Sequence, residues 1–408
     1  MDKTYFDQFR TGDYQRVNFD NFLSHIHFSY SVPSIHVTGT NGKGSTCVYL
    51  ASMYTSNGYK TGLFISPFLN EPNEMISING KAISDEDFLR IIEEHKKDID
   101  KYQLSAFEVQ TFVAFTYFIE NNCDIAVIEC GLGGETDATN VFDGILSIIT
   151  SVSLEHTDAL GYSISEITQQ KAGIIKEGKP ILIGDLPKDA VTVVVKKAKE
   201  TNSEIYYLGH YVNKMFHDDG YTFDYGEIKG VKIKSLADYS VDDACLALEG
   251  LFSLKEKFPY QEDKVKEGLA NAFVPCRLEV VSKQPLVIID GGHNPEAIDR
   301  LCQRPLKNIT SNKPIHIIFA CFRDKNMGNM LNSLGAITND LTLTTFDHPR
   351  ARKEEEFFLF LGDYTFRENA LELIKEKLAM YPDEAFLITG SLAFAAVVRK
   401  WFKEGLIK

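Results

Sequence analysis

Ile35-His36-Val37-Thr38-Gly39-Thr40-Asn41-Gly42-Lys43-Gly44-Ser45-Thr46 is the most informative stretch of this sequence. A short apolar strand at 35–37 runs into a glycine-rich turn, and a helix is expected from Cys47 onward. Glycines let successive backbone N–H groups converge on phosphate oxygens, and the helix N-terminus adds its positive dipole end. A lysine in the turn can reach the β- and γ-phosphates. The stretch predicts a triphosphate site whose contacts are Gly39, Thr40, Asn41, Gly42, Lys43, Gly44 and Ser45.

The turn does not follow the general phosphate-loop pattern, in which a second glycine is followed directly by Lys and then Ser or Thr. Val37 stands where the first glycine of that pattern belongs, and Gly44 separates Lys43 from Ser45. An ordinary glycine-rich turn between a strand and a helix is the alternative interpretation.

Length and composition indicate a globular protein of about two domains, because 44% of its 408 residues are hydrophobic and 25% are charged. The net charge of −14, with no block of Lys or Arg, argues against a nucleic-acid partner. The first residues lack the order of a signal peptide, and no apolar run approaches the length of a membrane span. We therefore expect a cytoplasmic protein with no membrane partner. Its seven scattered cysteines are expected to be reduced thiols.

Short apolar runs alternate with helix-like stretches, as in a parallel sheet of strand and helix units. A polar loop follows each of the first strands, where ligands of open α/β sheets bind. We predict an α/β fold: a phosphate-loop domain at 1–273, mainly parallel with a small antiparallel part near 204–234, and a Rossmann-like α/β domain at 277–408. The expected strands are 35–37, 62–65, 125–128, 146–150, 180–183, 286–290, 315–320, 341–346 and 385–389, and a helix is expected at 242–256.

The turn Gly39-Thr40-Asn41-Gly42-Lys43-Gly44-Ser45 closely resembles the loop of the Mur ligase superfamily, specifically of the folylpolyglutamate synthase and dihydrofolate synthase family. The resemblance covers most of residues 35–395 in the family's order. It implies that the chain has two domains of that family, the central ATP-binding domain and the C-terminal domain. Its further motifs are Ser66-Pro67-Phe68-Leu69, Asn73-Glu74, Glu129-Cys130-Gly131-Leu132-Gly133-Gly134-Glu135-Thr136-Asp137-Ala138-Thr139-Asn140, His156-Thr157-Asp158, Lys171-Ala172-Gly173-Ile174, Arg277-Leu278-Glu279, Asp290-Gly291-Gly292-His293-Asn294-Pro295 and Gly390-Ser391.

The resemblance implies metal and catalytic roles that the residues alone would not establish. Ser66, Glu129 and His156 match residues that hold magnesium in these ligases, although a strand-end Glu or a lone His is usually structural. Lys171 matches the lysine that these enzymes carboxylate with CO₂, which would make it a ligand of a second metal; read plainly, it is a solvated helix lysine. The implied cofactors are ATP, Mg²⁺ at two sites and, as a further candidate, a monovalent cation. The implied catalytic residues are Lys43, Lys171, His156 and Arg277.

The resemblance also implies substrate and nucleotide contacts. Ser105, Ala106, Phe107 and Glu108, together with Thr136, Asp137 and Ala138, lie in segments that contact the pterin side of the substrate. Ser105 and Glu108 also spell a helix capping box, and Asp137 could equally be a structural loop aspartate. In the second domain, the residues that match ATP contacts are Arg277, Asp290 and His293. An interface salt bridge is the alternative for Arg277, and a turn residue is the alternative for His293.

Four positions depart from the family pattern. Asp243 stands where an Asn usually recognises ATP, and a carboxylate cannot donate a hydrogen bond to adenine. Cys276 replaces the glycine before Arg277, which removes backbone freedom. Met75 replaces a common Arg. The usual Leu-Gly-Leu-Glu-Arg segment is unrecognisable in 10–22, a region that helps bind dihydropteroate in bifunctional relatives.

The resemblance implies an ATP-dependent ligase that adds L-glutamate to the γ-carboxyl group of a reduced folate through an acyl phosphate. Two alternatives stay open: the same chemistry on dihydropteroate, in a dihydrofolate synthase or a bifunctional enzyme, and a nucleotide-binding relative without catalysis. We expect a monomer whose partners are the small molecules folate, L-glutamate and ATP.

Overall fold

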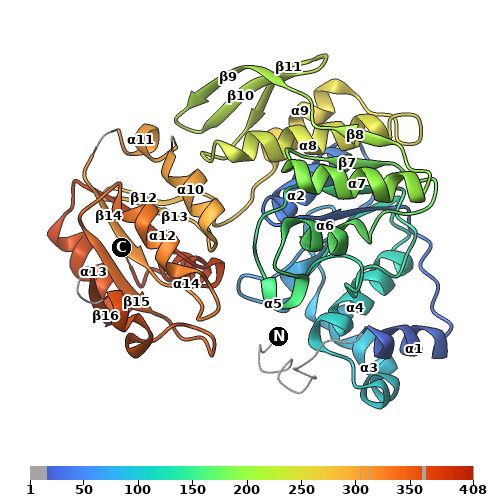
Figure 1. Ribbon diagram of the computed structural model, residues 1–408, viewed down its shortest axis with the longest axis horizontal. Helices are drawn as coiled ribbons and strands as arrows, with labels where there is room; N and C mark the ends of the chain where they lie inside the picture. The colour runs from blue at the N-terminus through green and yellow to red at the C-terminus, as the bar shows by residue number, and fades with distance from the viewer. Residues whose placement is uncertain (1–15, 304, 312, 361–363, 408) are drawn as a thin grey trace. The chain divides into compact units, whose positions relative to one another are not determined.

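The computed structural model of the protein describes residues 16–303, 305–311, 313–360 and 364–407 (Figure 1). Packing divides the chain into two compact units, which are described separately below. Unit 1 comprises Met1–Met215, Thr222–Ile233 and Ser240–Ala272, and unit 2 comprises Phe216–Tyr221, Lys234–Tyr239 and Phe273–Lys408.

An eight-stranded sheet in the order β4-β3-β2-β5-β1-β6-β7-β8 forms the centre of unit 1. The strands from β2 to β8 in this order are parallel, and β3 and β4 are antiparallel additions at one edge. Every residue of β1, β5, β6 and β7 is buried, as expected for parallel strands covered on both faces. The strand bounds are β1 Ser34–Thr38, β2 Thr61–Phe64, β3 Ile76–Ile78, β4 Lys81–Ala82, β5 Ile125–Glu129, β6 Leu146–Ile149, β7 Ile181–Ile183 and β8 Ile205–Tyr207.

Aromatic residues fill the core between this sheet and the helices α1, α3 and α4, which lie together in Figure 1. The rings of Phe22 in α1 and Phe112 in α4 meet edge to face with centroids 5.0 Å apart. The helices of the unit are α1 Val17–His25, α2 Lys43–Ser56, α3 Asp85–Tyr102, α4 Ala106–Glu120, α5 Thr157–Leu160, α6 Ile164–Ala172, α7 Lys188–Glu200, α8 Tyr239–Ser253 and α9 Glu262–Asn271, with a short 3₁₀ helix at Pro72–Met75.

A separate three-stranded sheet has the order β11-β10-β9, and β11 packs against α9. Its strands are β9 Tyr211–His217, β10 Gly220–Tyr225 and β11 Ile228–Ile233.

Unit 2 is built on a six-stranded sheet in the order β12-β13-β17-β14-β15-β16, parallel except for the edge strand β12. Residues of β13, β14, β15 and β17 pack with α10 and α12 in one hydrophobic core. The bounds are β12 Glu279–Lys283, β13 Leu286–Ile289, β14 Ile315–Phe319, β15 Leu341–Thr345, β16 Thr365–Asn369, β17 Ala385–Thr389, α10 Pro295–Gln303, α11 Pro305–Thr310, α12 Met327–Gly335, α13 Ala370–Met380 and α14 Leu392–Lys403, with a 3₁₀ helix at Glu354–Phe360.

The predicted α/β fold is confirmed, and each expected strand forms with its ends shifted by no more than one residue. The helix expected at 242–256 begins three residues earlier, at Tyr239. Strands β3, β4, β12 and β16 were not predicted; β16 is mostly exposed and carries little apolar pattern. Among the described residues, no helix is long and apolar enough to cross a membrane.

Candidate active site

The glycine-rich loop is held by the residues that follow the neighbouring strand β6. The Thr40 N–H donates to the Ser151 carbonyl at 2.9 Å, and the Asn41 N–H donates to Ser151 Oγ at 2.8 Å. Thr150 Oγ1 donates back to the Asn41 carbonyl at 2.6 Å. The loop conformation is therefore set by the sheet beneath it.

Two glycines of the loop are required by sterics. Gly42 immediately precedes α2 with a φ of 84°, a left-handed value that disfavours side chains. A Cβ at Gly39 would lie 1.9 Å from Thr150 Oγ1, and one at Gly42 would lie 2.3 Å from Asp243 Oδ1. Helix α2 begins at Lys43, four residues earlier than expected, so its free N–H groups face the same turn.

Two lysines from distant segments converge on one backbone atom of this loop. Lys43 Nζ donates to the Gly39 carbonyl oxygen at 3.1 Å, and Lys171 Nζ donates to the same oxygen at 2.8 Å. Lys43 also bonds the Thr40 carbonyl at 3.2 Å. The predicted phosphate-binding lysine and the predicted carboxylated lysine are therefore neighbours.

Lys171 lies near the end of α6 and is only 3% exposed. Burial, followed by repulsion from Lys43, lowers the pKa of its amine from 10.5 to about 7. A substantial fraction of the amine is therefore neutral at physiological pH. The interpretation of Lys171 as a solvated helix lysine is wrong.

The end of β5 delivers a carboxylate to the loop. Ala126 and Ile128 belong to the core shared with α4, so strand alternation directs Glu129 to the opposite face, where α2 packs. Glu129 is 3% exposed, and its Oε2 accepts from the Ser66 N–H at 3.0 Å. A Cβ at Gly44 would lie 3.4 Å from the same oxygen. The structure thus brings two predicted metal ligands, Ser66 and Glu129, to the loop.

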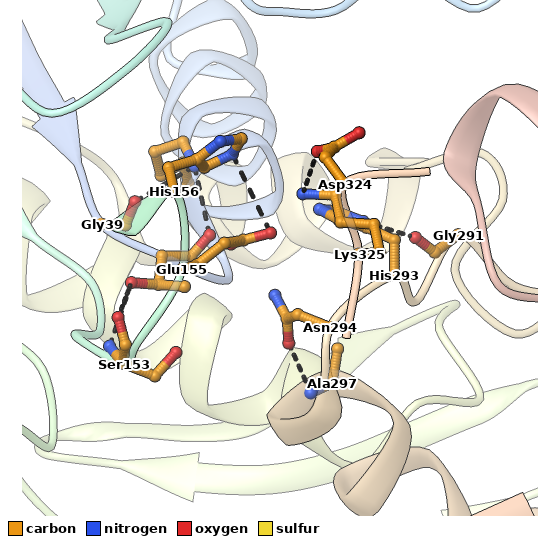
Figure 2. A network of polar contacts seen from close by, with 12 residues as sticks. Gly39, Ser153, Glu155, His156, Gly291, His293, Asn294, Ala297, Asp324 and Lys325 are labelled. Atoms are coloured by element: carbon orange, nitrogen blue, oxygen red, sulfur yellow. Dashed lines mark hydrogen bonds and ion pairs between the residues drawn. The ribbon is translucent and has the colours of Figure 1, made fainter. Parts of the chain in front are cut away.

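His156 lies in the segment that follows β6, three residues beyond Ser153, whose N–H donates to Thr40 Oγ1 at 3.0 Å. It directly precedes α5 with a left-handed φ of 52°. Its ring is 39% exposed, and Nε2 lies 3.9 Å from Glu155 Oε1 (Figure 2). The position leaves His156 accessible to a ligand, and its metal role stays a prediction.

The loop after β5 is organised by Asp137. Its Oδ2 accepts from the Leu132 N–H at 2.8 Å, and its Oδ1 accepts from the Thr139 N–H at 3.0 Å and from Thr139 Oγ1 at 2.5 Å. Asp137 is 4% exposed, and burial raises the pKa of its carboxyl. These contacts give Asp137 a structural role in the loop. Its predicted contact with a pterin ring is still untested. Its neighbour Thr136 is exposed, whereas Ala138 is buried.

The predicted capping box at the start of α4 is present. Glu108 Oε2 accepts from the Ser105 N–H at 2.7 Å, and the Glu108 N–H donates to Ser105 Oγ at 3.3 Å. Phe107, next to the partly buried Ala106, stacks on Phe64 at 5.8 Å. A Cβ at Gly131 would lie 2.6 Å from the Phe107 ring, so this ring lies against the loop that Asp137 organises.

Two departures from the family pattern in unit 1 have clear positions. Asp243, in α8, has a carboxylate oxygen against Gly42 and is 9% exposed, so it lies beside the phosphate loop. Its contact with adenine stays a prediction. Met75 is 2% exposed in the core of α1, α3 and α4, where it packs as an apolar side chain.

In unit 2, Asp290 fixes the end of β13. Its Oδ1 accepts from the Gly292 N–H at 2.7 Å, and its Oδ2 accepts from the Leu278 N–H at 2.9 Å and the Tyr239 hydroxyl at 3.0 Å. A Cβ at Gly291 would lie 3.0 Å from Arg277 Nη1. Arg277 and Asp290, both predicted to contact ATP, therefore lie near each other at this end of the sheet.

Cys276 adopts the conformation that explains the glycine of the family pattern. Its φ is 58°, in the left-handed region. The side chain is fully buried, and burial raises the pKa of its thiol to about 12. Its carbonyl accepts from the Gly291 N–H at 2.8 Å, and its own N–H donates to Glu279 Oε2 at 2.9 Å.

His293 and Asn294 occupy the turn before α10, as Figure 2 shows. His293 Nδ1 lies 2.9 Å from the Gly291 carbonyl, which is a turn contact, and Asn294 Oδ1 accepts from the Ala297 N–H at 2.9 Å. The predicted contact of His293 with ATP stays a prediction.

Sequence reasoning missed Arg16, which lies in the segment that we found unrecognisable. Its Nη1 donates to the Glu135 carbonyl at 2.8 Å and to the Asn140 carbonyl at 3.4 Å. The part of that segment at 10–15 lies outside the described residues. The available signal was the arginine at position 16, because the Leu-Gly-Leu-Glu-Arg segment of the family pattern also ends in arginine. Across the described residues, no group of three His, Cys, Asp or Glu side chains is preassembled for a metal.

Comparison with known proteins places this chain in a family. Residues 37–248 match the Mur ligase middle domain, and residues 276–392 match the family described as Mur ligase, glutamate ligase domain. The chain belongs to the Mur ligase family. It is 31% identical over 411 residues to the folylpolyglutamate synthase of Lacticaseibacillus casei, covering 96% of this chain and 94% of the relative. It is 32% identical over 397 residues to the dihydrofolate synthase/folylpolyglutamate synthase of Bacillus subtilis, covering 92% of each.

A solved structure described as an FPGS–AMPPCP–folate complex superimposes on this Mur ligase with a TM-score of 0.86. The identity is 29%, and the match covers 97% of both chains. The predicted membership of the folylpolyglutamate synthase and dihydrofolate synthase branch is confirmed. An ATP-binding ligase is the class of enzyme to which this chain belongs.

Proposed function

We propose that this chain adds L-glutamate to the γ-carboxyl group of a reduced folate at the expense of ATP. The observation that carries the proposal is the convergence of Lys43, Lys171 and Glu129 on one glycine-rich loop. Relatives that match nearly the whole chain are named for this reaction.

The chemistry requires an activated carboxyl group. A folate carboxylate oxygen attacks the γ-phosphorus of ATP, the bond to the β-phosphate oxygen breaks, and ADP leaves. The α-amine of glutamate then attacks the acyl carbon, phosphate departs and the amine proton passes to solvent. Lys43 would leave the Gly39 carbonyl to neutralise the β- and γ-phosphates, and Arg277 would neutralise the transferring phosphate.

Magnesium fits the oxygen donors of Glu129 and Ser66, because Glu129 is a buried carboxylate directed at the phosphate loop. We propose that His156 completes this donor set. His156 and carboxylated Lys171 would together hold a second ion. Bound there, magnesium would supply charge neutralisation for the phosphates and the acyl oxygen. The neutral fraction of the Lys171 amine supports its carboxylation by CO₂. A monovalent cation, a cytoplasmic location and a monomeric state are proposed from the sequence alone.

A second substrate, dihydropteroate, is favoured by the Bacillus subtilis relative, whose name includes dihydrofolate synthase. One assay separates the two: glutamate-dependent ADP release with tetrahydrofolate and dihydropteroate side by side. We expect release with tetrahydrofolate. Release with dihydropteroate alone would overturn the first choice, and release with neither would overturn both.

The Lys43→Ala variant is the matched test of the loop. It should release ADP at least about a hundredfold more slowly, as for other lost electrostatic contacts to a transition state. Lys264→Ala, on the exposed side of α9, is the control that should keep full activity. Unchanged turnover in Lys43→Ala would contradict the phosphate-loop assignment.

A further inference from the structure

Arg16 joins the N-terminal helix to the loop that carries the proposed substrate contacts. Its Nη1 donates to the carbonyls of Glu135 and Asn140 at 2.8 and 3.4 Å. These two residues bracket the segment Thr136-Asp137-Ala138. One terminal nitrogen of the guanidinium therefore contacts both ends of a single loop, while Nε of the same group pairs with Asp20.

The same loop is tied to the end of α6, which carries Lys171. Asn140 Nδ2 donates to the carbonyls of Glu135 and Gly173, both at 3.1 Å. The Glu135 N–H donates to the Gln170 carbonyl at 2.7 Å. A Cβ at Gly173 would lie 2.3 Å from the Glu135 Cβ, so the two backbones are in direct contact. Lys171 lies between Gln170 in α6 and Gly173 just after the helix, the two residues whose carbonyls accept hydrogen bonds from the loop.

The stability of helix α1 does not by itself account for an arginine at position 16. It directly precedes the first turn of α1, where a cation opposes the helix dipole. Asp20, in that first turn, accepts from Arg16 Nε at 3.2 Å and offsets part of the charge. The side chain is nevertheless 28% exposed and directed at the loop. Its shortest contact, to the Glu135 carbonyl at 2.8 Å, is therefore with the loop and not with its own helix.

We propose that Arg16 is a positioning residue, which holds 135–140 in the geometry that binds the acyl substrate and keeps that loop in register with Lys171. The inference rests on the proposed function for its substrate. Asp137 accepts hydrogen bonds from N–H groups within the loop. Arg16 bonds the carbonyls at the two ends of the loop, and Asn140 bonds the loop to the Gly173 carbonyl.

The test uses the full chain with Arg16→Ala and Arg16→Lys, and with Arg90→Ala as the matched control. Arg90 lies on α3, is 38% exposed and pairs with Glu120 at 2.6 Å, so its loss removes an Arg ion pair elsewhere in the same unit. We expect Arg16→Ala to raise the KM for tetrahydrofolate about tenfold while the KM for ATP changes less than about twofold. The variant loses the two hydrogen bonds from a charged group to the loop at 135–140, and this loop carries the proposed contacts with the folate. Arg16→Lys should be intermediate. Added ethylguanidinium should restore Arg16→Ala and leave Arg90→Ala unchanged.

Hydrogen exchange of the segment 131–140 gives a readout that does not need turnover. In Arg16→Ala the amides of Leu132 and Thr139 should exchange at least about tenfold faster than in Arg90→Ala. Unchanged exchange would overturn the proposal. So would faster exchange with an unchanged KM for tetrahydrofolate, or an equal rise in both KM values. A wild-type chain that releases no ADP with either folate substrate would instead overturn the proposed function, while exchange and direct titration of tetrahydrofolate would still decide the role of Arg16.

Discussion

Lys43 and Lys171 donate to the same carbonyl oxygen, that of Gly39, at 3.1 and 2.8 Å. Burial of Lys171, and after it repulsion between the two amines, disfavours the charged form of Lys171. Conversion of Lys171 to a carbamate would replace this repulsion with an ion pair. This relationship connects the nucleotide loop with the proposed second metal site.

Carboxylation of Lys171 is the first prediction. The neutral amine attacks CO₂, an N–C bond forms, and the amine loses a proton to give a carbamate anion. With ¹³C-bicarbonate, the wild-type protein should show one bicarbonate-derived carbamate signal by NMR, increasing as pH rises through about 7. The signal should vanish in Lys171→Arg and survive in Lys179→Arg, which changes an exposed lysine. A signal that persists in Lys171→Arg would refute the assignment.

The pKa of Lys171 also predicts how stability depends on pH in CO₂-free buffer. Between about pH 7 and 10.5 the unfolded chain binds the proton and the folded chain does not, so stability rises with pH in this window. Lys171→Met removes the burial cost and should be more stable than wild type by a few kcal/mol below pH 7, since one pKa unit is about 1.4 kcal/mol.

The gain in Lys171→Met should shrink as pH rises from about 7 toward 10.5. Urea midpoints at about pH 6 and about pH 9 measure it, with Lys179→Met as the exposed control. An equal gain at both pH values would show that the Lys171 amine is not the titrating group.

Asp243 places a carboxylate beside the loop that holds the triphosphate. Asp243→Asn removes a like charge and supplies an N–H donor, as in the family pattern. We expect the KM for ATP to fall roughly fivefold, about 1 kcal/mol, as for a partly screened charge pair. Asp242→Asn, on the adjacent residue, is the control. A raised KM in Asp243→Asn would show that the carboxylate makes a favourable contact with the nucleotide site.

Cys276 predicts a stability series in unit 2. A left-handed φ costs an ordinary residue about 1–2 kcal/mol, and more if it is β-branched. Cys276→Gly should therefore change the free energy of unfolding by less than about 1 kcal/mol, because relief of strain is offset by a freer unfolded chain.

The matching destabilising variant is Cys276→Val, which should lose about 2 kcal/mol relative to wild type. Urea unfolding followed by fluorescence of Trp401, the single tryptophan of the chain, reports on this unit. Cys321→Val, at another buried cysteine of unit 2, is the control for added volume. Equal losses at both positions would mean that backbone strain at 276 is unimportant.

The sequence predicted the strands around the site well, because buried parallel strands are short apolar runs bounded by polar loops. It also predicted the proximity of Ser66, Glu129 and the loop, since strand ends meet at one edge of a sheet. The edge strand β16 gave no such signal, because its side chains are mostly exposed.

Other features depend on contacts between distant segments. Nothing local to Lys171 indicates that it is buried against Gly39, and a helix lysine reads as solvated. The bond of Arg16 to the Glu135–Asn140 loop spans more than a hundred residues of sequence. The left-handed backbone at Cys276 was indicated only by the glycine of the family pattern, because cysteine itself has no preference for that conformation.

The most direct test follows label from the folate carboxylate. Tetrahydrofolate with ¹⁸O in its γ-carboxyl group is incubated with the full chain, ATP, magnesium and L-glutamate, and the products are analysed by mass spectrometry. The proposed acyl phosphate predicts a glutamylated folate and one ¹⁸O atom in the released phosphate. The absence of a glutamylated product, or phosphate without label, would contradict ATP-driven amide formation by this chain.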